Sequence, residues 1–184
     1  MDRANVDTDQ IIPKQFLKRI ERTGFGQFLF YDWRFQEDGS TPNSEFELNH
    51  PSVADASILV ARRNFGSGSS REHAVWALDD YGFRSIIAPS FADIFFNNCF
   101  KNGVLPITLA ESHIDELFAT AKEKGTYEIT VDLENLVVFD DEGWERSFDV
   151  DPSRREKMLK GLDDIAETLM HEEKISHHEK TRAF

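Results

Sequence analysis

The residues most able to do chemistry lie between positions 64 and 74, where the chain reads NFGSGSSREHA. Two glycines let the backbone approach a ligand closely, and three serines and an arginine supply hydroxyl groups and a cation. If a helix begins where the serines end, its unpaired N–H groups and the positive end of its dipole would face the same ligand. This segment therefore indicates a site that holds a small anion and acts on it. The alternative interpretation is a loop that only caps a helix.

Two familiar catalytic loops do not fit this segment. The Gly-Lys-Ser/Thr ending of a nucleotide-binding P-loop is missing. The glycines and serines from Gly66 to Ser70 do not follow the G-x-S-x-G pattern of a hydrolase nucleophile. A Ser-His-Asp hydrolase therefore has weak support.

Other reactive side chains have simpler interpretations. Asp7 and Asp9 are too few for an EF-hand type of cation site, so we expect a turn in which an aspartate orients an arginine or a hydroxyl. His73 could act as a base, but a histidine one turn into a helix more often packs against its neighbours. Cys99 lies among phenylalanines, so we expect a buried thiol that behaves as a small apolar group. We expect this chain to bind no metal.

The patterns around the loop predict an α/β domain. The expected order is a strand at 56–61, the helix behind the loop, a strand at 85–88, a helix from Phe91 to just before Gly103, a strand at 104–109 and a helix at 111–124. Pro106 would put the third strand at an edge or a bulge. At the first helix, Ser69 and Glu72 match a capping box, and Gly82 is placed to end it.

After residue 126 the apolar period changes to two, which predicts a β-meander with strands at 127–131, 136–139 and 144–150. A helix is then expected from Pro152, followed after Gly161 by an apolar stripe of Leu162, Ile165, Leu169 and Met170. Residues 14–35 are expected to form a mobile loop and a short aromatic element. We predict one domain over 1–170 and a charged, flexible tail over 171–184.

The composition narrows the function classes. The 184 residues include 34 acidic and 21 basic side chains, a net charge of −13, which disfavours nucleic-acid binding because phosphate groups need cations. The single cysteine excludes a disulfide within the chain and an iron–sulfur site made by this chain alone. No apolar run reaches the roughly 18 residues of a membrane span, and the N-terminus lacks a signal-peptide pattern. These features predict a soluble, cytoplasmic protein.

Three segments, taken in their order and spacing, resemble the family of 3-isopropylmalate dehydratase small subunits, the separately encoded swivelling domain of the aconitase superfamily. They read NVDTDQIIP at 5–13, NFGSGSSREHA at 64–74 and IAPSFADIF at 87–95. The sequences KNGVLP at 101–106 and FYDWRF at 30–35 extend the likeness, which covers nearly all of residues 3–170.

The resemblance implies a three-layer β/β/α swivelling domain. It also implies the interconversion of 2-isopropylmalate and 3-isopropylmalate through an enoic acid, in leucine biosynthesis. A large subunit is the implied partner, in a heterodimer or a heterotetramer, and it would hold the 4Fe–4S cluster whose iron binds the substrate hydroxyl and a carboxylate as a Lewis acid. This chain would close over that cluster and would be inactive alone.

The resemblance also implies roles for single residues. Ser69 matches the catalytic serine, which takes a carbon-bound proton as an alkoxide and returns it on the other carbon. The N–H groups at the helix start and the cation of Arg71 would stabilise that oxyanion, and Arg71 would also clamp a carboxylate bidentately. Ser70 would hold a substrate carboxylate or assist through its backbone N–H. Asp9 matches an aspartate that orients the site. These roles require the Ser69 hydroxyl to face both Arg71 and an open cleft.

The loop after the first segment corresponds to the one thought to sense the substrate's variable substituent. The substrate-binding candidates there are Phe16, Leu17 and Lys18, with Arg19 and Ile20 beside them. Among these, the apolar residues suit an isopropyl group.

Two features depart from the family pattern. Position 67 is Ser where bacterial relatives frequently have Cys, and we expect this change to affect only loop packing. The chain also begins at or just after the first strand expected in the family, so we expect a weakened first sheet edge.

Two other functions stay open at this level. The same chemistry could serve homoaconitate, citraconate or methylmalate-type acids, because the specificity loop does not identify its substrate. The chain could instead be a non-catalytic anion-binding or regulatory module, which would not co-purify with an iron–sulfur protein.

Overall fold

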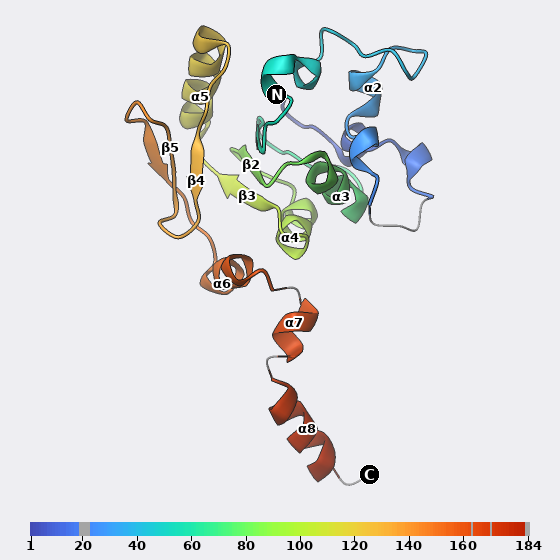
Figure 1. Ribbon diagram of the computed structural model, residues 1–184, viewed down its shortest axis with the longest axis vertical. Helices are drawn as coiled ribbons and strands as arrows, with labels where there is room; N and C mark the ends of the chain where they lie inside the picture. Colours follow the sequence, from blue (N-terminus) through green and yellow to red (C-terminus); the bar gives the residue numbers. More distant parts are fainter. Residues whose placement is uncertain (19–22, 163, 170, 183–184) are drawn as a thin grey trace.

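The computed structural model describes residues 1–18, 23–162, 164–169 and 171–182 (Figure 1). Its strands are β1 Ile58–Val60, β2 Ser85–Ala88, β3 Leu105–Thr108, β4 Thr130–Asp132, β5 Val137–Phe139 and β6 Glu145–Ser147. Its α-helices are α1 Thr8–Ile11, α2 Tyr31–Arg34, α3 Glu72–Tyr81, α4 Asp93–Lys101, α5 Glu111–Lys124, α6 Pro152–Lys160, α7 Asp164–Leu169 and α8 Glu172–Thr181. Within these ranges no helix is both long and apolar enough to cross a bilayer.

The first three strands form a parallel sheet in the order β1-β2-β3. All four residues of β2 are buried, because the strand has a neighbour on each side and is covered on both faces. Pro106 pairs with Ile86 and lies in β3, an edge strand of this sheet, as its missing N–H predicts. At the opposite edge of the sheet, formed by β1, the amino group of Met1 donates to the carbonyl of Val60 (3.0 Å).

The remaining strands form the predicted antiparallel meander, β4-β5-β6. Successive side chains of β2 point to opposite faces of the parallel sheet, so Ile86 enters one core cluster and Ile87 the other. The first cluster packs α3, α4 and the N-terminal segments on one face (Figure 1). The second packs α5 and the meander on the other. The β/β/α layering implied by the resemblance is confirmed.

The capping box predicted at Ser69 and Glu72 is wrong. Helix α3 begins at Glu72 with Arg71 as its N-cap residue, and no side chain in the described part of the chain caps it. The Ser69 hydroxyl instead accepts a hydrogen bond from the Arg71 side chain, so it is not available to the helix. Gly82 ends α3 as predicted, with a φ of +122°.

A capping box does occur at α1, where the sequence did not lead us to expect one. The side chain of Asp7 accepts from the backbone N–H of Gln10 (2.8 Å), and the side chain of Gln10 accepts from the N–H of Asp7 (2.9 Å). These two bonds fix the first turn of a helix that is too short to be stable alone.

The other elements agree with the predicted order, but several bounds differ. The strands are shorter than the apolar runs that predicted them, and α4 starts at Asp93 rather than Phe91, because residues 91 and 92 pair in extended form with the loop before α3. Helix α6 starts at Pro152 and ends at Gly161, which adopts the left-handed conformation.

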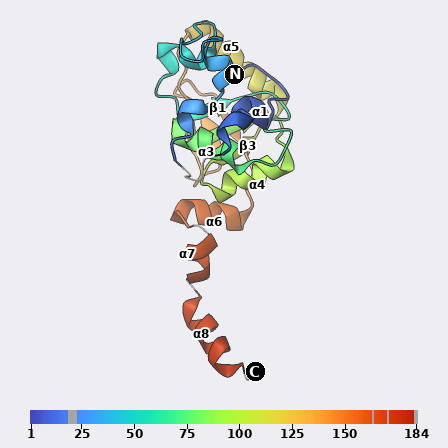
Figure 2. The ribbon, with the colours of Figure 1, turned by 90° about the vertical axis from the view of Figure 1, so that its right-hand side faces the viewer.

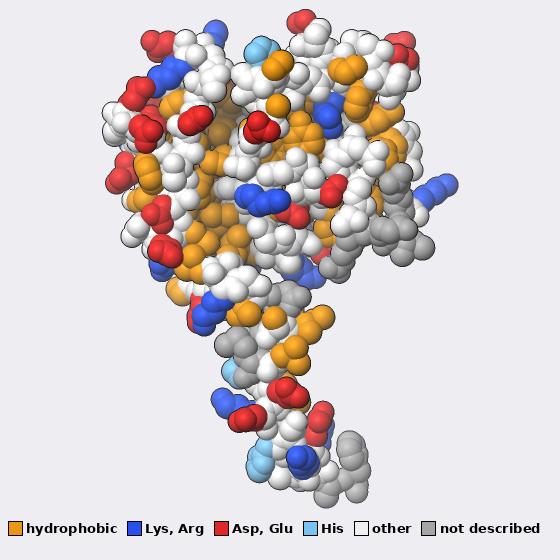
Figure 3. Space-filling view, in the orientation of Figure 1, with side chains coloured by type: hydrophobic (Ala, Val, Ile, Leu, Met, Phe, Trp, Pro, Cys, Tyr) orange, Lys and Arg blue, Asp and Glu red, His pale blue; other side chains and the backbone are white. Residues whose placement is uncertain are grey.

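The C-terminal segment projects away from the two sheets (Figures 1 and 2). Ile165 and Leu169 of the predicted apolar stripe are 71% and 60% exposed, while Met170 lies outside the described residues. Hydrophobic side chains are visible on the surface of this segment in Figure 3. Residues 172–181 are helical, where the sequence suggested a frayed end; flexibility of the tail stays a prediction.

Gly66 joins the loop before α3 to α4. Its backbone has a φ of +75°, and a Cβ added there would overlap the ring of Phe95. Its N–H donates to the carbonyl of Val6 (2.8 Å), which ties the loop to the residues before α1 as well. Only glycine meets both requirements without strain.

Replacing Gly66 by alanine is expected to lower the free energy of unfolding by about 2–5 kcal/mol, because strain at positive φ adds to overlap with Phe95. Gly103→Ala is the matched control: its φ is also +75°, but no described atom lies within 4 Å of the added Cβ. We expect that control to lose only about 1–2 kcal/mol in urea unfolding. Equal losses in the two variants would show that the close approach of Phe95 is unimportant.

Candidate active site

A cavity of about 230 Å³ opens where residues 64–71, the Gly/Ser loop, meet the starts of α1 and α4. The loop contributes Gly66, Gly68 and the run from Ser69 to Arg71, α1 contributes Thr8, and residues 92–95 form the remaining wall. The loop follows β1 and the α4 segment follows β2, so both lie at the carboxyl ends of parallel strands, where ligands bind in open α/β sheets.

The start of α1 holds the loop in position. The backbone N–H of Thr8 donates to the carbonyl of Ser67 (2.9 Å), and the Thr8 hydroxyl donates to the carbonyl of Ser69 (2.8 Å). Thr8 is buried and contacts both ends of the loop segment that precedes Ser70. The conformation of the predicted catalytic serine therefore depends on a residue 61 positions earlier.

Arg71 links the two segments through its guanidinium. Its Nη1 and Nη2 atoms donate to the two carboxylate oxygens of Asp9, with Nη2 at 3.0 Å from Oδ2. Nη2 also donates to the hydroxyl of Ser69 at 3.1 Å. The Arg71 side chain is only 10% exposed, so the ion pair is well shielded on the arginine side. Asp9 orients an arginine, as the sequence predicted for this turn.

The Ser69 hydroxyl has the environment that an alkoxide requires. It lines the cavity, and a charged donor points at its oxygen. A hydrogen bond from a cation favours the deprotonated form of the group that accepts it. From the sequence, N–H groups at a helix start were expected to help stabilise the alkoxide. Helix α3 begins three residues after Ser69, however, and the group in direct contact with the Ser69 oxygen is the Arg71 guanidinium.

The arginine also keeps Asp9 ionised. Its hydrogen bonds are the largest reason that the pKa of the Asp9 carboxyl lies below its ordinary value, and Lys14 adds a weaker attraction at 3.8 Å. Because the folded pKa is lowered, the pair stabilises the fold above the ordinary carboxyl pKa. This contribution disappears as the pH falls through the lowered value.

The bidentate clamp that Arg71 was predicted to make on a substrate carboxylate is instead made on Asp9. Among the described residues, Nε and one N–H of Nη1 of Arg71 have no acceptor. These donors, with the exposed hydroxyl of Ser70, are what the loop still offers to a ligand.

His73 does not belong to this group of residues. Its ring packs at 4.6 Å from the ring of Trp76 and at 5.3 Å from that of Phe25, and burial lowers its pKa. The packing role predicted for this histidine is confirmed.

The expected specificity loop lies apart from the cavity. Phe16 stacks on Phe28 with ring centroids 4.1 Å apart, Leu17 packs on the same core cluster, and Lys18 is exposed. Of the described residues at 14–18, none lines the cavity. Arg19 and Ile20 lie outside the described residues.

Sequence reasoning assigned no site role to five residues of the cavity wall: Thr8, Ala92, Asp93, Ile94 and Phe95. Thr8 was overlooked between two aspartates that suggested ion binding. Asp93 and Ile94 lie among phenylalanines in the segment 87–95, which carried the family resemblance and predicted a helix but suggested no role for single residues. These residues could have been predicted to lie at a site because they follow a predicted parallel strand, and ligands bind at the carboxyl ends of such strands.

This chain's residues do not fit an iron–sulfur cluster. Cys99 is fully buried, and burial raises the pKa of its thiol well above the usual value, so it cannot act as an accessible thiolate ligand. Asp7 caps α1 and Asp9 holds Arg71. In the described ranges, no three His, Cys, Asp or Glu side chains group as metal ligands would.

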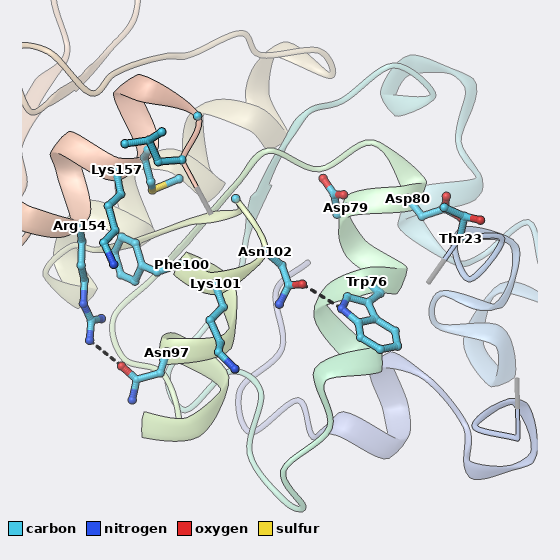
Figure 4. Close-up of a pocket in the computed structure, with 14 residues that line it drawn as sticks. Thr23, Trp76, Asp79, Asp80, Asn97, Phe100, Lys101, Asn102, Arg154 and Lys157 are labelled. Carbon is cyan, nitrogen blue, oxygen red and sulfur yellow. Dashed lines mark hydrogen bonds between the residues drawn. The ribbon is translucent and has the colours of Figure 1, made fainter. Parts of the chain in front are cut away.

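A larger cavity, about 790 Å³, lies elsewhere, between α3, α4 and α6 (Figure 4). Trp76 Nε1 donates to Asn102 Oδ1 there (2.9 Å), and Arg154 donates to Asn97 Oδ1 (2.7 Å). It is open to solvent and includes none of the residues of the Ser69 site.

Comparisons with known proteins show the family of this chain. Residues 1–112 match the family model described as the aconitase C-terminal domain, and residues 115–152 match one described as LeuD_N. The chain is 72% identical to the 3-isopropylmalate dehydratase small subunit of Rhodopirellula baltica, over 99% of this chain and 93% of that protein. It is 64% identical to the protein of the same name from Geobacillus kaustophilus, over 98% and 90%.

A solved structure gives the same result. The crystal structure of a 3-isopropylmalate dehydratase (LeuD) from Methanocaldococcus jannaschii superposes with a TM-score of 0.64 at 25% identity. The superposition covers 96% of this chain and 93% of that one.

The Arg71–Asp9 contact predicts a specific titration. In an NMR titration of carboxyl carbons, Asp9 should have a midpoint below that of an ordinary aspartate, and Arg71→Gln should raise it, because the largest cause of the lowered pKa is removed. Asp38 is the internal control: hydrogen bonds from Thr41 and Ser40 lower its pKa to about 2, and this value should not move. An Asp9 midpoint unchanged by Arg71→Gln would mean that the ion pair does not form in solution.

Proposed function

The chain belongs to the family of 3-isopropylmalate dehydratase small subunits, and on that premise we propose that it is one part of a hydro-lyase. The enzyme interconverts 2-isopropylmalate and 3-isopropylmalate by dehydration and rehydration, in leucine biosynthesis. A large subunit completes it, in a heterodimer or a heterotetramer, and we expect both in the cytoplasm. The 4Fe–4S cluster is assigned to the large subunit because the lone, buried thiol of this chain does not fit it.

One observation carries the proposal: the hydroxyl of Ser69 faces a cavity while the guanidinium of Arg71 donates to it. A serine hydroxyl is ordinarily far too weak an acid to serve as a base near neutral pH. A charged donor fixed at its oxygen stabilises the alkoxide, and the fixed geometry avoids reorganisation when the charge develops. Asp9 keeps that donor in place.

The proton chemistry assigned to this chain is a transfer between two carbons. The Ser69 alkoxide takes the proton from the substrate carbon next to the one that loses its hydroxyl, which gives the enoic acid, a neutral serine and a hydroxide; the cluster of the large subunit would supply the Lewis acid for that hydroxide. The serine hydroxyl then returns this proton to the other carbon during rehydration. Arg71 stabilises the charged form at each end of the cycle.

The remaining donors of the loop hold the substrate. The N–H groups of Arg71 that Asp9 and Ser69 leave unused, and the hydroxyl of Ser70, are suited to a substrate carboxylate. The high net negative charge of the chain makes this local concentration of donors necessary for a dianionic substrate. Homoaconitate, citraconate and methylmalate-type acids remain competing substrates for the same assay.

The first test removes the proposed base. Ser69→Ala, reconstituted with a cluster-loaded large subunit, should lose about 10²–10⁴-fold in kcat, the range typical of a proton-transfer group. The wild-type chain alone should show no turnover. The measurement is the rate of isopropylmalate isomerisation, followed through the absorbance of the enoic acid.

Ser67→Ala is the matched control for that test. It removes a hydroxyl from the same loop, but the Ser67 side chain is not part of the cavity wall, and only its backbone bonds to α1. It should retain activity within about twofold, as expected of a change that removes no substrate contact. Full activity of Ser69→Ala, or turnover by the chain without its partner, would contradict the proposal.

The second test concerns the cation. Arg71→Lys keeps the charge but cannot donate to both oxygens of Asp9 and to Ser69 in one plane. We expect kcat to fall about 10²–10³-fold, in line with the loss of one oriented donor to a developing oxyanion. Steady-state kinetics of the reconstituted complex provides the measurement, and a silent substitution would remove Arg71 from the mechanism.

A further inference from the structure

Ile94 is an exposed apolar side chain on the wall of the Ser69 cavity. It is 53% exposed and lies in the first turn of α4. Single exposed apolar residues are common and need no explanation by themselves. This one differs because, of the described residues around the cavity, it is the large apolar side chain that remains open to solvent; its neighbour Phe95 is buried.

The position of Ile94 is fixed by its neighbours. The N–H of Ala92 donates to the carbonyl of Phe65 (3.0 Å), and the N–H of Phe65 donates to the carbonyl of Ser90 (3.1 Å), so the approach to α4 is tied to the Gly/Ser loop. Phe95 packs against Gly66. A β-branched side chain in a helix has one strongly preferred χ1 rotamer. Ile94 therefore presents a rigid apolar surface to the cavity.

The charges around the cavity favour one orientation of a branched dicarboxylate. Arg71 and Ser70 supply donors from the loop, whereas α4 supplies the exposed carboxylate of Asp93 beside Ile94. A substrate carboxylate is attracted to the loop and repelled by the Asp93 carboxylate on the α4 wall. The uncharged alkyl branch is the part of the substrate that can lie against α4.

We propose, on the basis of the function proposed above, that Ile94 contacts the isopropyl branch of the substrate and contributes to its selection. Phe16 and Leu17, the described apolar residues of the expected specificity loop, pack on the core and do not line this cavity. The other possible occupant of the Ile94 surface is the large subunit. The two occupants affect different measurements.

The test compares a branched with an unbranched ligand on the reconstituted enzyme. Ile94→Ala should lower kcat/KM for isopropylmalate roughly tenfold, and Ile94→Val by roughly two- to threefold, because less apolar surface covers the branch. The inhibition constant of malate, which has the carboxylates but no branch, should change less than twofold. Ile165→Ala is the matched control, since Ile165 is also exposed but lies on α7, away from the cavity.

Each other outcome overturns the inference. Equal losses for isopropylmalate and malate, or weaker assembly of Ile94→Ala with the large subunit in a titration of activity, would assign Ile94 to the partner interface. No change in any constant would leave Ile94 without a substrate contact. Failure of the function itself is distinguishable, because the wild-type complex would then not convert isopropylmalate at all.

Discussion

The contact between Arg71 and Asp9 is the interaction on which the site depends. It joins residues 62 positions apart and holds one guanidinium against both a carboxylate and the Ser69 hydroxyl. Without the Asp9 carboxylate, the long Arg71 side chain would sample many rotamers, and few of them would place a donor at the Ser69 oxygen. With it, the donor is fixed before a substrate arrives, which is the condition under which an oriented charge contributes most to a reaction.

The fold explains how these groups meet. The parallel order β1-β2-β3 brings the segments after β1 and β2 to the same edge of the sheet. The Gly/Ser loop and the start of α4 are those two segments, and Gly66 lets them touch. The start of α1 then bonds to the loop. The Thr8 hydroxyl donates to the carbonyl of Ser69, and the Asp9 carboxylate accepts from Arg71.

Much of this was predictable from sequence. The strand, loop and helix order followed from apolar periods and glycine positions, and the motif around Ser69 and Arg71 indicated the site directly. Because two aspartates are too few for a cation site, the turn at Asp7 and Asp9 was predicted to orient an arginine or a hydroxyl, and Asp9 does pair with an arginine. The layering required the resemblance, since periodicity alone cannot say which face of a sheet a helix covers.

The differences from the sequence prediction have local physical causes. Ser69 matched a capping box because its spacing to Glu72 is right. In the structure, however, the Ser69 hydroxyl accepts a hydrogen bond from the Arg71 guanidinium instead of from the helix. Phe16 and Leu17, predicted to bind the substrate, respectively stack on Phe28 and pack on the adjoining core, so they do not line the cavity; their role at the substrate stays a prediction. A short sequence window cannot predict tertiary contacts of this kind, because it does not show which distant side chains meet.

A double-mutant cycle on Ser69 and Arg71 would test the central claim most directly. If the guanidinium acts by stabilising the serine alkoxide, Arg71→Lys should cost little more once Ser69→Ala has removed that oxygen, because the two residues work as one unit. We expect the turnover number of the double variant to lie within a fewfold of that of Ser69→Ala alone. If the two losses instead multiply, the arginine acts independently of the serine, and the proposed role of their hydrogen bond is wrong.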